Sequence, residues 1–388
     1  MDRKIRMGMV GGGRESLIGP IHRIAAQMDN KIELVAGAFS STAEKSRLSG
    51  HDLLISSDRI YDDFKQMIDS EKILSDDQKI DFISIVTPNN FHYDVAKEAL
   101  SAGFHVVCDK PLAMNLDQAL MLEQEVINSG LIFCVTYNYT GYPMVKEARQ
   151  MIMSGDLGSV RKVVVEYPQG WLADAIENTG NKQAAWRSDP NQAGPSSCMG
   201  DSGSLCASLA EYITGLSISE ICADLTTFVS GRKLDDDGSV LLRFNNGAKG
   251  ILWASQVAIG MENALKIRIY AEKGTLEWSQ EEPNSLWVRF GDRPTEIRRS
   301  GTDFVGTFAS SNVRLPAGHP EGYIEAFANI YRAFAEDLSI VIDGGPSRNI
   351  SSDYPQVKDG VRGMYFINAV VKSLASHEKW ISLLDEKQ

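Results

Sequence analysis

Lys110 is the residue of this chain whose type and position point most directly to chemistry. It follows an aspartate and the apolar run 104–108, which reads Phe-His-Val-Val-Cys, and it precedes a proline. The run is typical of a buried strand, so we expect Lys110 at a carboxyl strand end, where ligands bind in parallel α/β sheets. A lysine placed there can accept a proton from an alcohol. The alternative is an exposed lysine in a turn.

A glycine-rich turn is the second chemical feature. Residues 10–19 read VGGGRESLIG, after the strand-like run 5–10 and before a helix that begins near residue 21. Glycines let a backbone approach a pyrophosphate, and the amino end of a helix stabilises its charge. The spacing is longer than G-x-G-x-x-G, and such turns are commonly structural. Two further features favour dinucleotide binding over a purely structural turn. They are a second strand over 32–39 and the sequence Thr-Pro-Asn-Asn at 87–90, after a third strand.

The end of the second strand bears on the choice between NAD and NADP. An acid normally holds the ribose hydroxyls of NAD at this point, but the chain reads Phe39-Ser40-Ser41, with Lys45 and Arg47 beyond. The hydroxyls and cations could bind the 2′-phosphate of NADP. Equally, Ser40 could cap the next helix and Lys45 could be a solvated surface side chain. The sequence therefore leaves NAD or NADP open. The expected cofactor-binding residues are Gly11, Gly13, Ser16, Ser40, Ser41, Lys45, Thr87, Pro88, Asn89, His92, Asp109, Lys110 and Asn138.

The elements that must position these residues form an α/β protein of two domains. Strand and helix patterns alternate over 1–140, which predicts a Rossmann domain with a doubly wound parallel sheet. Over 141–388 the strands alternate polar and apolar residues, which predicts an α/β domain with a large open, mainly antiparallel sheet. A helix over 357–376 is expected to pack back on the first domain. The exposed sheet face favours a homodimer or homotetramer.

Composition excludes several classes of protein. The chain has 388 residues and a formal net charge of −12, which argues against nucleic acid as a partner because phosphate binding needs a basic surface. No apolar stretch reaches the length of a membrane span, and no signal-peptide core follows Met1, so we expect a cytoplasmic protein without membrane partners. The five cysteines lack metal-ligand spacing, which predicts reduced thiols and no metal site.

Taken together, these features resemble the Gfo/Idh/MocA family, the glucose-fructose oxidoreductase and inositol dehydrogenase group. The resemblance covers nearly the whole chain: the glycine turn, Thr87-Pro88-Asn89, Asp109-Lys110-Pro111 in place of Glu-Lys-Pro, Trp186-Arg187, and Gly200-Asp201-Ser202-Gly203. It implies an NAD(P)-dependent dehydrogenase or reductase that transfers a hydride between nicotinamide and a secondary alcohol or ketone carbon of a cyclic sugar or polyol. The resemblance gives Lys110 the role of acid/base, and Asp201 that of orienting the lysine or the substrate.

One position departs from the family pattern. The acid at 201 is normally followed four residues later by a histidine on the same helical face, but this chain has Leu205. A leucine transfers no proton, so either Lys110 works alone, another group replaces the histidine, or the usual reaction is absent. Two alternatives follow: a redox-neutral NAD-using lyase, epimerase or glycoside-cleaving enzyme, and a non-catalytic regulator that binds nucleotide and sugar.

The substrate side is defined by residue type and by the resemblance. Tryptophans offer flat surfaces for sugars, and Arg187 suits hydroxyls or a carboxylate, although tryptophans are more often core residues. Tyr139 follows a strand end, and a long polar loop over 174–197 is expected to be a binding loop or lid. The expected substrate-binding residues are Lys110, Tyr139, Trp171, Trp186, Arg187, Asp201 and His319.

Overall fold

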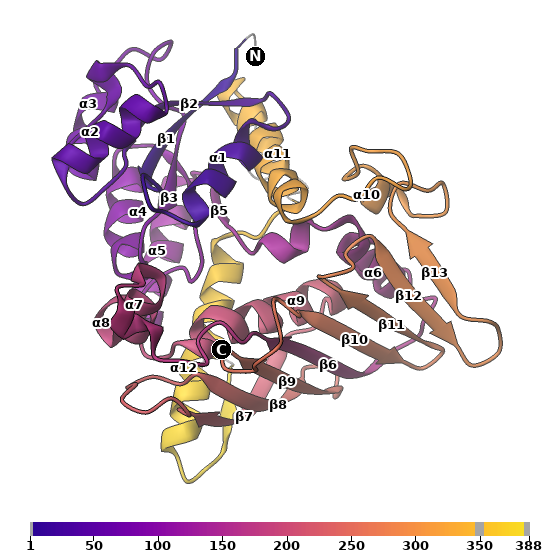
Figure 1. Ribbon diagram of the computed structural model, residues 1–388. Helices are drawn as coiled ribbons and strands as arrows, with labels where there is room; N and C mark the ends of the chain where they lie inside the picture. Colours follow the sequence, from indigo (N-terminus) through magenta and orange to yellow (C-terminus); the bar gives the residue numbers. More distant parts are fainter. Residues whose placement is uncertain (1–2, 346–352, 384–388) are drawn as a thin grey trace. The chain divides into compact units, whose positions relative to one another are not determined.

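The computed structural model describes residues 3–345 and 353–383 (Figure 1). Its chain divides into two compact units. The first unit comprises residues up to Asn138 together with Ile324–Val361, and the second comprises Tyr139–Tyr323 and the residues from Arg362 onward. The chain therefore leaves the first unit, builds most of the second, and returns. Within the described residues, no helix combines the length and the apolar character needed to cross a bilayer.

The first unit is built on a five-stranded parallel sheet with the order β2-β1-β3-β4-β5, which confirms the predicted Rossmann architecture. The strands are near-continuous apolar runs because helices cover both faces. The strands are β1 (Ile5–Gly11), β2 (Ile32–Ala38), β3 (Phe82–Val86), β4 (His105–Cys108) and β5 (Phe133–Val135). The helices between them are α1 (Ile18–Gln27), α2 (Ala43–Asp52), α3 (Phe64–Glu71), α4 (His92–Ser101) and α5 (Leu116–Ser129).

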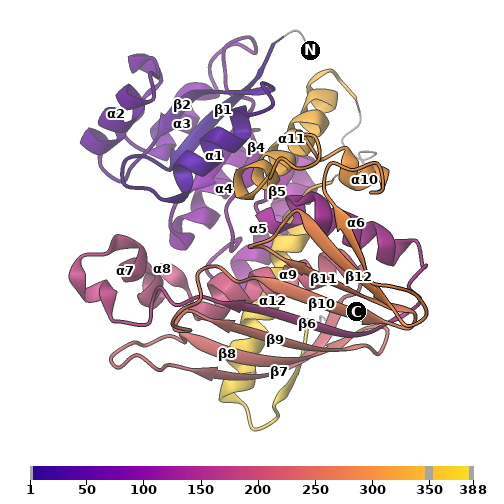
Figure 2. The ribbon, with the colours of Figure 1, turned by 45° about the vertical axis from the view of Figure 1, so that its right-hand side comes forward.

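A long helix from late in the sequence belongs to the same unit. Helix α11 (Tyr323–Ile342) lies beside α1 in both Figure 1 and Figure 2. Its buried aromatic side chains reach the sheet: the ring of Phe334 lies 5.0 Å from that of Phe82 in β3, and the hydroxyl of Tyr331 lies 2.9 Å from Ser84 Oγ. Helix α12 (Val357–Ala375) begins in the first unit and ends in the second.

The second unit contains a nine-stranded sheet with the order β13-β12-β11-β10-β6-β9-β8-β7-β14. Only the β6–β9 pair is parallel, which confirms the prediction of a large, mainly antiparallel sheet. The strands are β6 (Val160–Pro168), β7 (Ile218–Thr226), β8 (Asp237–Phe244), β9 (Lys249–Ser255), β10 (Lys266–Ala271), β11 (Gly274–Ser279), β12 (Ser285–Phe290), β13 (Glu296–Arg299) and β14 (Trp380–Ser382). The helices of this unit include α6 (Pro143–Met153), α9 (Ser204–Thr214) and α10 (Thr307–Ser310).

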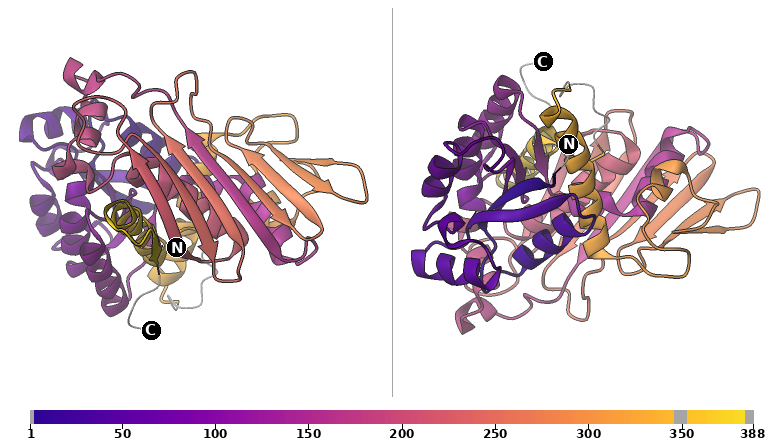
Figure 3. Two further views of the ribbon diagram at one scale, coloured as in Figure 1. Left: turned by 90° about the horizontal axis from the view of Figure 1, so that it is seen from below. Right: turned by 90° about the horizontal axis from the view of Figure 1, so that it is seen from above.

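The two faces of this sheet differ. Helices α6 and α9 pack on one face, whose side chains are buried, and the left panel of Figure 3 shows the strands from the other face. On that outer face the strand register places one row of side chains across six strands: Leu241, Ile251, Val164, Arg268, Glu277 and Trp287. None of these side chains is fully buried within the unit. The alternation of polar and apolar residues along the strands therefore gives the sheet an outer face of mixed apolar and charged side chains, which α6 and α9 do not cover.

The segment 174–197, expected to be a loop, contains short helices. Helix α7 (Lys182–Ser188) starts at Asn181, whose side chain accepts hydrogen bonds from the N–H groups of Gln183 and Ala184. Helix α8 (Pro190–Ala193) follows, with Asp189 as its cap. The cap and the helix-forming sequence KQAAWR explain why this segment is helical.

Candidate functional site

The glycine positions between β1 and α1 have no room for a side chain. A β-carbon at Gly11, where φ is +80°, would lie 2.4 Å from the carbonyl oxygen of Val86, and one at Gly19 would lie 2.3 Å from that of Gly12. The hydroxyl of Ser16 accepts a hydrogen bond from the N–H of Gly19 at 3.0 Å. Gly19 thus packs the helix against the turn, the role of the third glycine in a dinucleotide-binding fingerprint. This role of Gly19 is hard to recognise in the sequence, because the glycines are spaced further apart than in G-x-G-x-x-G.

The cations beyond β2 are paired. Lys45 Nζ lies 3.7 Å from a carboxylate oxygen of Glu15. Arg47 makes two hydrogen bonds with the carboxylate of Asp62, at 3.0 and 2.9 Å. The serines at 40–41 follow β2 and are not buried. Lys45 and Arg47, the two cations near the expected site of a 2′-phosphate, therefore each have a carboxylate partner already.

His92 joins the turns that follow β3 and β4. Its ring is fully buried, with Nε2 at 2.9 Å from the carbonyl oxygen of Thr87 and Nδ1 at 2.7 Å from that of Pro111. Burial lowers the pKa of His92, and the nearby Asp109 carboxylate acts in the opposite direction. This histidine is a structural tie between the two turns expected to carry cofactor-binding residues.

Asp109 is the charged centre of the turn that carries Lys110. One of its oxygens, Oδ1, accepts hydrogen bonds from the backbone N–H of Lys110 at 2.9 Å and from Thr136 Oγ1 at 2.8 Å. Its other oxygen, Oδ2, lies 3.9 Å from Nε2 of His22. Burial acts to raise the pKa of Asp109, but the interactions with His22, Lys110 and His92 outweigh it and hold that pKa below its usual range.

Several polar atoms in the turns after β3 and β5 lack a hydrogen-bond partner among the described residues. They include Oγ1 of Thr87 and Oδ1 of Asn90, after β3, and Nδ2 of Asn138, after β5. Pro88 and the buried Asn89 lie in the same turn as Thr87. Because buried polar groups are normally satisfied, such atoms beside a turn closed to side chains fit a bound dinucleotide. The residues of the first unit therefore suit NAD or a related cofactor.

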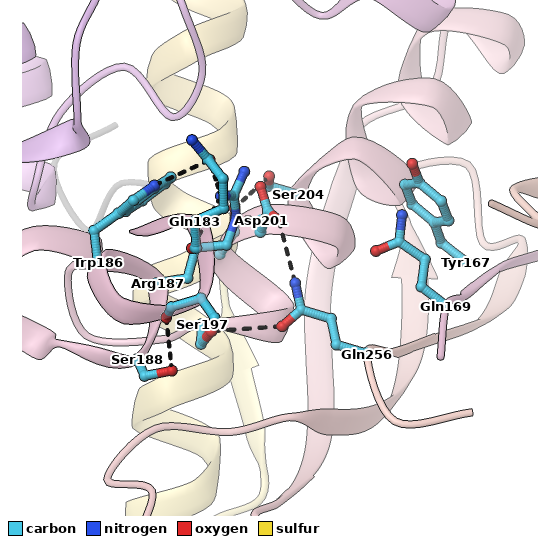
Figure 4. A network of polar contacts seen from close by, with 12 residues as sticks. Tyr167, Gln169, Gln183, Trp186, Arg187, Ser188, Ser197, Asp201, Ser204 and Gln256 are labelled. Carbon is cyan, nitrogen blue, oxygen red and sulfur yellow. Dashed lines mark hydrogen bonds and ion pairs between the residues drawn. The ribbon is translucent and has the colours of Figure 1, made fainter. Parts of the chain in front are cut away.

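Asp201 in the second unit lies in a single π-helical turn, Met199–Gly203, directly before α9. Its Oδ2 accepts hydrogen bonds from Arg187 Nε at 3.1 Å and from Gln256 Nε2 at 3.2 Å, and Arg187 Nη1 donates to Gln183 Oε1 at 2.8 Å (Figure 4). A π-turn inserted in a helix is frequently found at functional sites. The structure thus joins two of the predicted substrate residues, Arg187 and Asp201, in one network.

The two predicted tryptophans also belong to this network. The guanidinium carbon of Arg187 lies 4.2 Å from the ring centre of Trp186 and 5.6 Å from that of Trp171. Cation–π contacts of this kind hold the arginine in place. One face of each indole is therefore used by Arg187, which leaves less aromatic surface for a sugar than the sequence suggested.

Asp235 fixes the start of the π-turn. Its two carboxylate oxygens accept hydrogen bonds from the N–H groups of Ser197 at 3.0 Å and Met199 at 2.8 Å. Burial raises the pKa of Asp235, and these hydrogen bonds act against that shift. Nothing local in the sequence marks Asp235, since its hydrogen-bond partners are almost forty positions away.

Tyr139 lies in a buried polar chain. Its hydroxyl lies 2.5 Å from that of Tyr167, which donates to Asn263 Oδ1 at 2.6 Å. Burial raises the pKa of Tyr139 to about 12, against the effect of these hydrogen bonds. At neutral pH Tyr139 is therefore a neutral hydroxyl, suited to hydrogen bonding rather than to acting as a base.

His319 and Leu205 complete the predicted set. His319 is exposed, and its Nδ1 lies 3.1 Å from the carbonyl oxygen of Pro316 in its own turn. Leu205 is buried in the first turn of α9. The described contacts of His319 stay local, so they provide no replacement for the histidine that Leu205 displaces.

Comparison with known proteins identifies the family. Residues 5–151 match the family model described as "Oxidoreductase family, NAD-binding Rossmann fold", and residues 145–277 match "GFO/IDH/MocA C-terminal domain". These two matches cover most of the chain. The chain belongs to the Gfo/Idh/MocA family of oxidoreductases, and its first unit is an NAD-binding Rossmann domain.

Individual relatives agree over nearly the full length. The oxidoreductase YfiI of Bacillus subtilis is 34% identical over 98% of this chain and 97% of its own. A levoglucosan dehydrogenase of Pseudarthrobacter phenanthrenivorans is 26% identical over 82% of this chain and 84% of its own. A crystal structure of an inositol dehydrogenase homolog from Azotobacter vinelandii with NAD+ has a TM-score of 0.93 and 34% identity, with 98% of each chain covered. The same homolog was also crystallised with NADH and myo-inositol.

We expect Asp235→Asn to destabilise the second unit. An asparagine offers only one acceptor oxygen to the two N–H groups that Asp235 now satisfies, so the free energy of unfolding should fall by about 1–3 kcal/mol. Denaturant unfolding measures this change. The matched control is Asp292→Asn at an exposed aspartate, which should leave the midpoint unchanged. Equal midpoints for the two variants would contradict the role given to Asp235.

Proposed function

We propose that the protein is an NAD-dependent dehydrogenase that oxidises a secondary alcohol of a cyclic polyol or sugar, or reduces the corresponding ketone, with Lys110 as acid/base. The observation that carries this proposal is the turn after β4, where an ionised Asp109 holds the backbone of Lys110 at the carboxyl end of a Rossmann strand. Ligands of such sheets bind outside that end. The membership of the family supports the same reaction class.

The chemistry divides between cofactor and protein. When bound, NAD supplies the carbon that accepts or returns the hydride. Lys110, in its neutral form, takes the proton from the substrate hydroxyl during oxidation and returns it during reduction. The carboxylate of Asp109 fixes the backbone of that lysine, and His92 ties its turn to the turn that follows β3.

We propose that Arg187 and Asp201 recognise the hydroxyls of the substrate. Their ion pair leaves the network without net charge, which suits a neutral polyol better than an acidic sugar. The relatives support this class: one is named a levoglucosan dehydrogenase, and the Azotobacter vinelandii homolog was crystallised with myo-inositol. Trp186 and Tyr139 are proposed to contribute an aromatic edge and a hydroxyl to the same recognition.

Leu205 favours a second candidate function. Without the usual histidine, the chain retains cofactor-binding features and Lys110 but lacks one proton-transfer group. A redox-neutral enzyme that oxidises its substrate only transiently, or a regulator that binds nucleotide and sugar, would tolerate that loss. Product analysis without added cofactor distinguishes these candidates from a dehydrogenase with net turnover.

Lys110→Met tests the main proposal. We expect turnover of the best substrate from a panel of cyclic polyols and sugars, followed by nicotinamide absorbance, to fall by about 10²–10⁴-fold, because the proton acceptor is removed. NAD+ affinity should change little. Lys97→Met, at an exposed lysine of α4, is the control and should be fully active. Normal turnover by the Lys110 variant would show that another group acts as base. Tight NAD+ binding by the wild type without any absorbance change would favour the regulator.

We propose a preference for NAD over NADP, since Glu15 and Asp62 pair the cations beyond β2. The wild type should bind NAD+ more tightly than NADP+ in calorimetric titrations. Glu15→Gln should narrow that difference by increasing affinity for NADP+, because it frees Lys45 for a 2′-phosphate. Glu44→Gln, at an exposed acid of α2, is the control. Equal affinities for the two cofactors in the wild type would refute the preference.

We propose that a second copy of the chain covers the outer face of the large sheet. Leu241 and Ile251 are paired in register on that face and are 48% and 40% exposed, so together they offer an apolar centre for a contact between two copies of the same sheet face. Light scattering should give a dimer or tetramer for the wild type. Ile251→Glu should yield monomers, because a carboxylate would be buried without a partner. Ile73→Glu, at an exposed position of the first unit, should leave the assembly intact. A monomeric wild type would refute this assembly.

A further inference from the structure

His22 is a buried titratable residue with no part in the reaction described above. It lies in α1, its side chain has no exposed surface, and its ring packs edge-on against Phe327 at 4.6 Å between ring centres. Its Nε2 faces Oδ2 of Asp109 at 3.9 Å and has no hydrogen-bond partner among the described residues. A fully buried imidazole directed at the carboxylate beside Lys110 calls for an explanation beyond packing.

The other ring nitrogen of His22 begins a chain of hydroxyl groups. Its Nδ1 lies 2.7 Å from the hydroxyl of Tyr331 in α11, and that hydroxyl lies 2.9 Å from Oγ of Ser84 in β3. Burial raises the pKa of Tyr331, so its hydroxyl keeps its proton. All three side chains are buried, and three separate elements contribute one member each.

With a neutral His22 ring, one arrangement of hydrogens satisfies the whole chain. Ser84 donates to Tyr331, Tyr331 donates to Nδ1 of His22, and the ring proton of His22 is then on Nε2, directed toward Asp109. The opposite tautomer would turn a lone pair of Nε2 toward the carboxylate, which is repulsive. At 3.9 Å the last contact is longer than a hydrogen bond and acts as an electrostatic attraction.

We propose that Ser84, Tyr331 and His22 form a positioning relay, which fixes the Asp109 carboxylate and, through it, the electrostatic environment of the reacting lysine. The inference rests on the proposed function of Lys110 as acid/base. The relay does not touch substrate, so its members are positioning residues. It also explains why a buried tyrosine and histidine from distant parts of the chain meet below the turn after β4.

The charged and titratable groups around Asp109 define the expected effect. His22 faces it from α1, His92 from α4 and Lys110 from its own turn, and Tyr331 and the buried thiols of Cys108 and Cys134 lie nearby. Burial raises the pKa of both thiols, so they remain neutral at physiological pH. Loss of the Nε2–H of His22 would leave the negative charge of Asp109 less compensated. The ammonium form of the lysine would then be favoured, and a higher pH would be needed to produce the free base.

Tyr331→Phe tests the relay with the smallest change in shape. In ¹⁵N-histidine NMR spectra, we expect the wild type to show His22 as the Nε2–H tautomer alone, and Tyr331→Phe to show a mixture in which the Nδ1–H tautomer is also populated, because Nδ1 has lost the donor that fixes it as an acceptor. In activity assays, the acidic limb of the kcat/KM profile for oxidation should move to higher pH by about 0.5–1 unit, the effect of one hydrogen bond of about 1 kcal/mol. KM should change less than kcat.

Tyr61→Phe is the matched control. Tyr61 is another buried tyrosine of the first unit, and its hydroxyl donates to the carboxylate of Glu71 at 2.8 Å, away from the relay. Its variant should lose stability to a similar extent but keep both the His22 tautomer and the pH profile. If Tyr331→Phe proves unstable, His22→Gln replaces it and should move the acidic limb in the same direction.

The outcomes separate the relay from the proposed function. If Lys110→Met abolishes turnover while Tyr331→Phe leaves the tautomer and the pH profile unchanged, the relay is wrong and the acid/base assignment stands. If Lys110→Met turns over normally, the acid/base assignment is wrong, and the tautomer of His22 in the two tyrosine variants decides alone whether the hydroxyl chain orients that ring.

Discussion

The charge of Asp109 is the constraint on which the turn after β4 depends. A largely buried carboxylate is costly unless hydrogen bonds and opposite charges compensate it. Here the compensation comes from the Lys110 backbone, the Thr136 hydroxyl and two histidines in different helices. Each of these partners lowers the free energy of the ionised acid, so the packing of α1 and α4 and the chemistry at the strand end are coupled.

Much of the first unit could be predicted from the sequence, because parallel strands buried on both faces are continuous apolar runs such as 82–86. The antiparallel strands with clean alternation were equally clear. Strand β7 gave a weaker signal, since a register shift between Ile218 and Glu220 breaks its period of two. The return of residues 324–361 to the first unit has no local signature, because it is decided by which surface buries the apolar face of α11.

The candidate site divides in the same way. Lys110 and Asp201 could be predicted as site residues because a strand end and a short motif mark them in the sequence. His22, Tyr331 and Asp235 could not be singled out, since their contacts are with partners far along the chain rather than with neighbours. The tryptophans were recognised by type, but their shared contact with Arg187 depends on the helix α7, which lies in a polar segment that lacks an obvious helical pattern.

The contact between His22 and Tyr331 also bears on how the protein is made. The two residues are 309 positions apart, and α11 leaves the ribosome after all the strands of the first unit's sheet. During synthesis, the sheet face that α11 covers therefore stays exposed until residues 139–323 of the second unit have been translated. Closing so long a loop slows folding, and an uncovered apolar face is prone to aggregation. While it is being synthesised, the amino-terminal part of the first unit is thus an incompletely packed intermediate. Its exposed apolar face must be protected from aggregation, a requirement that is not visible in the finished fold.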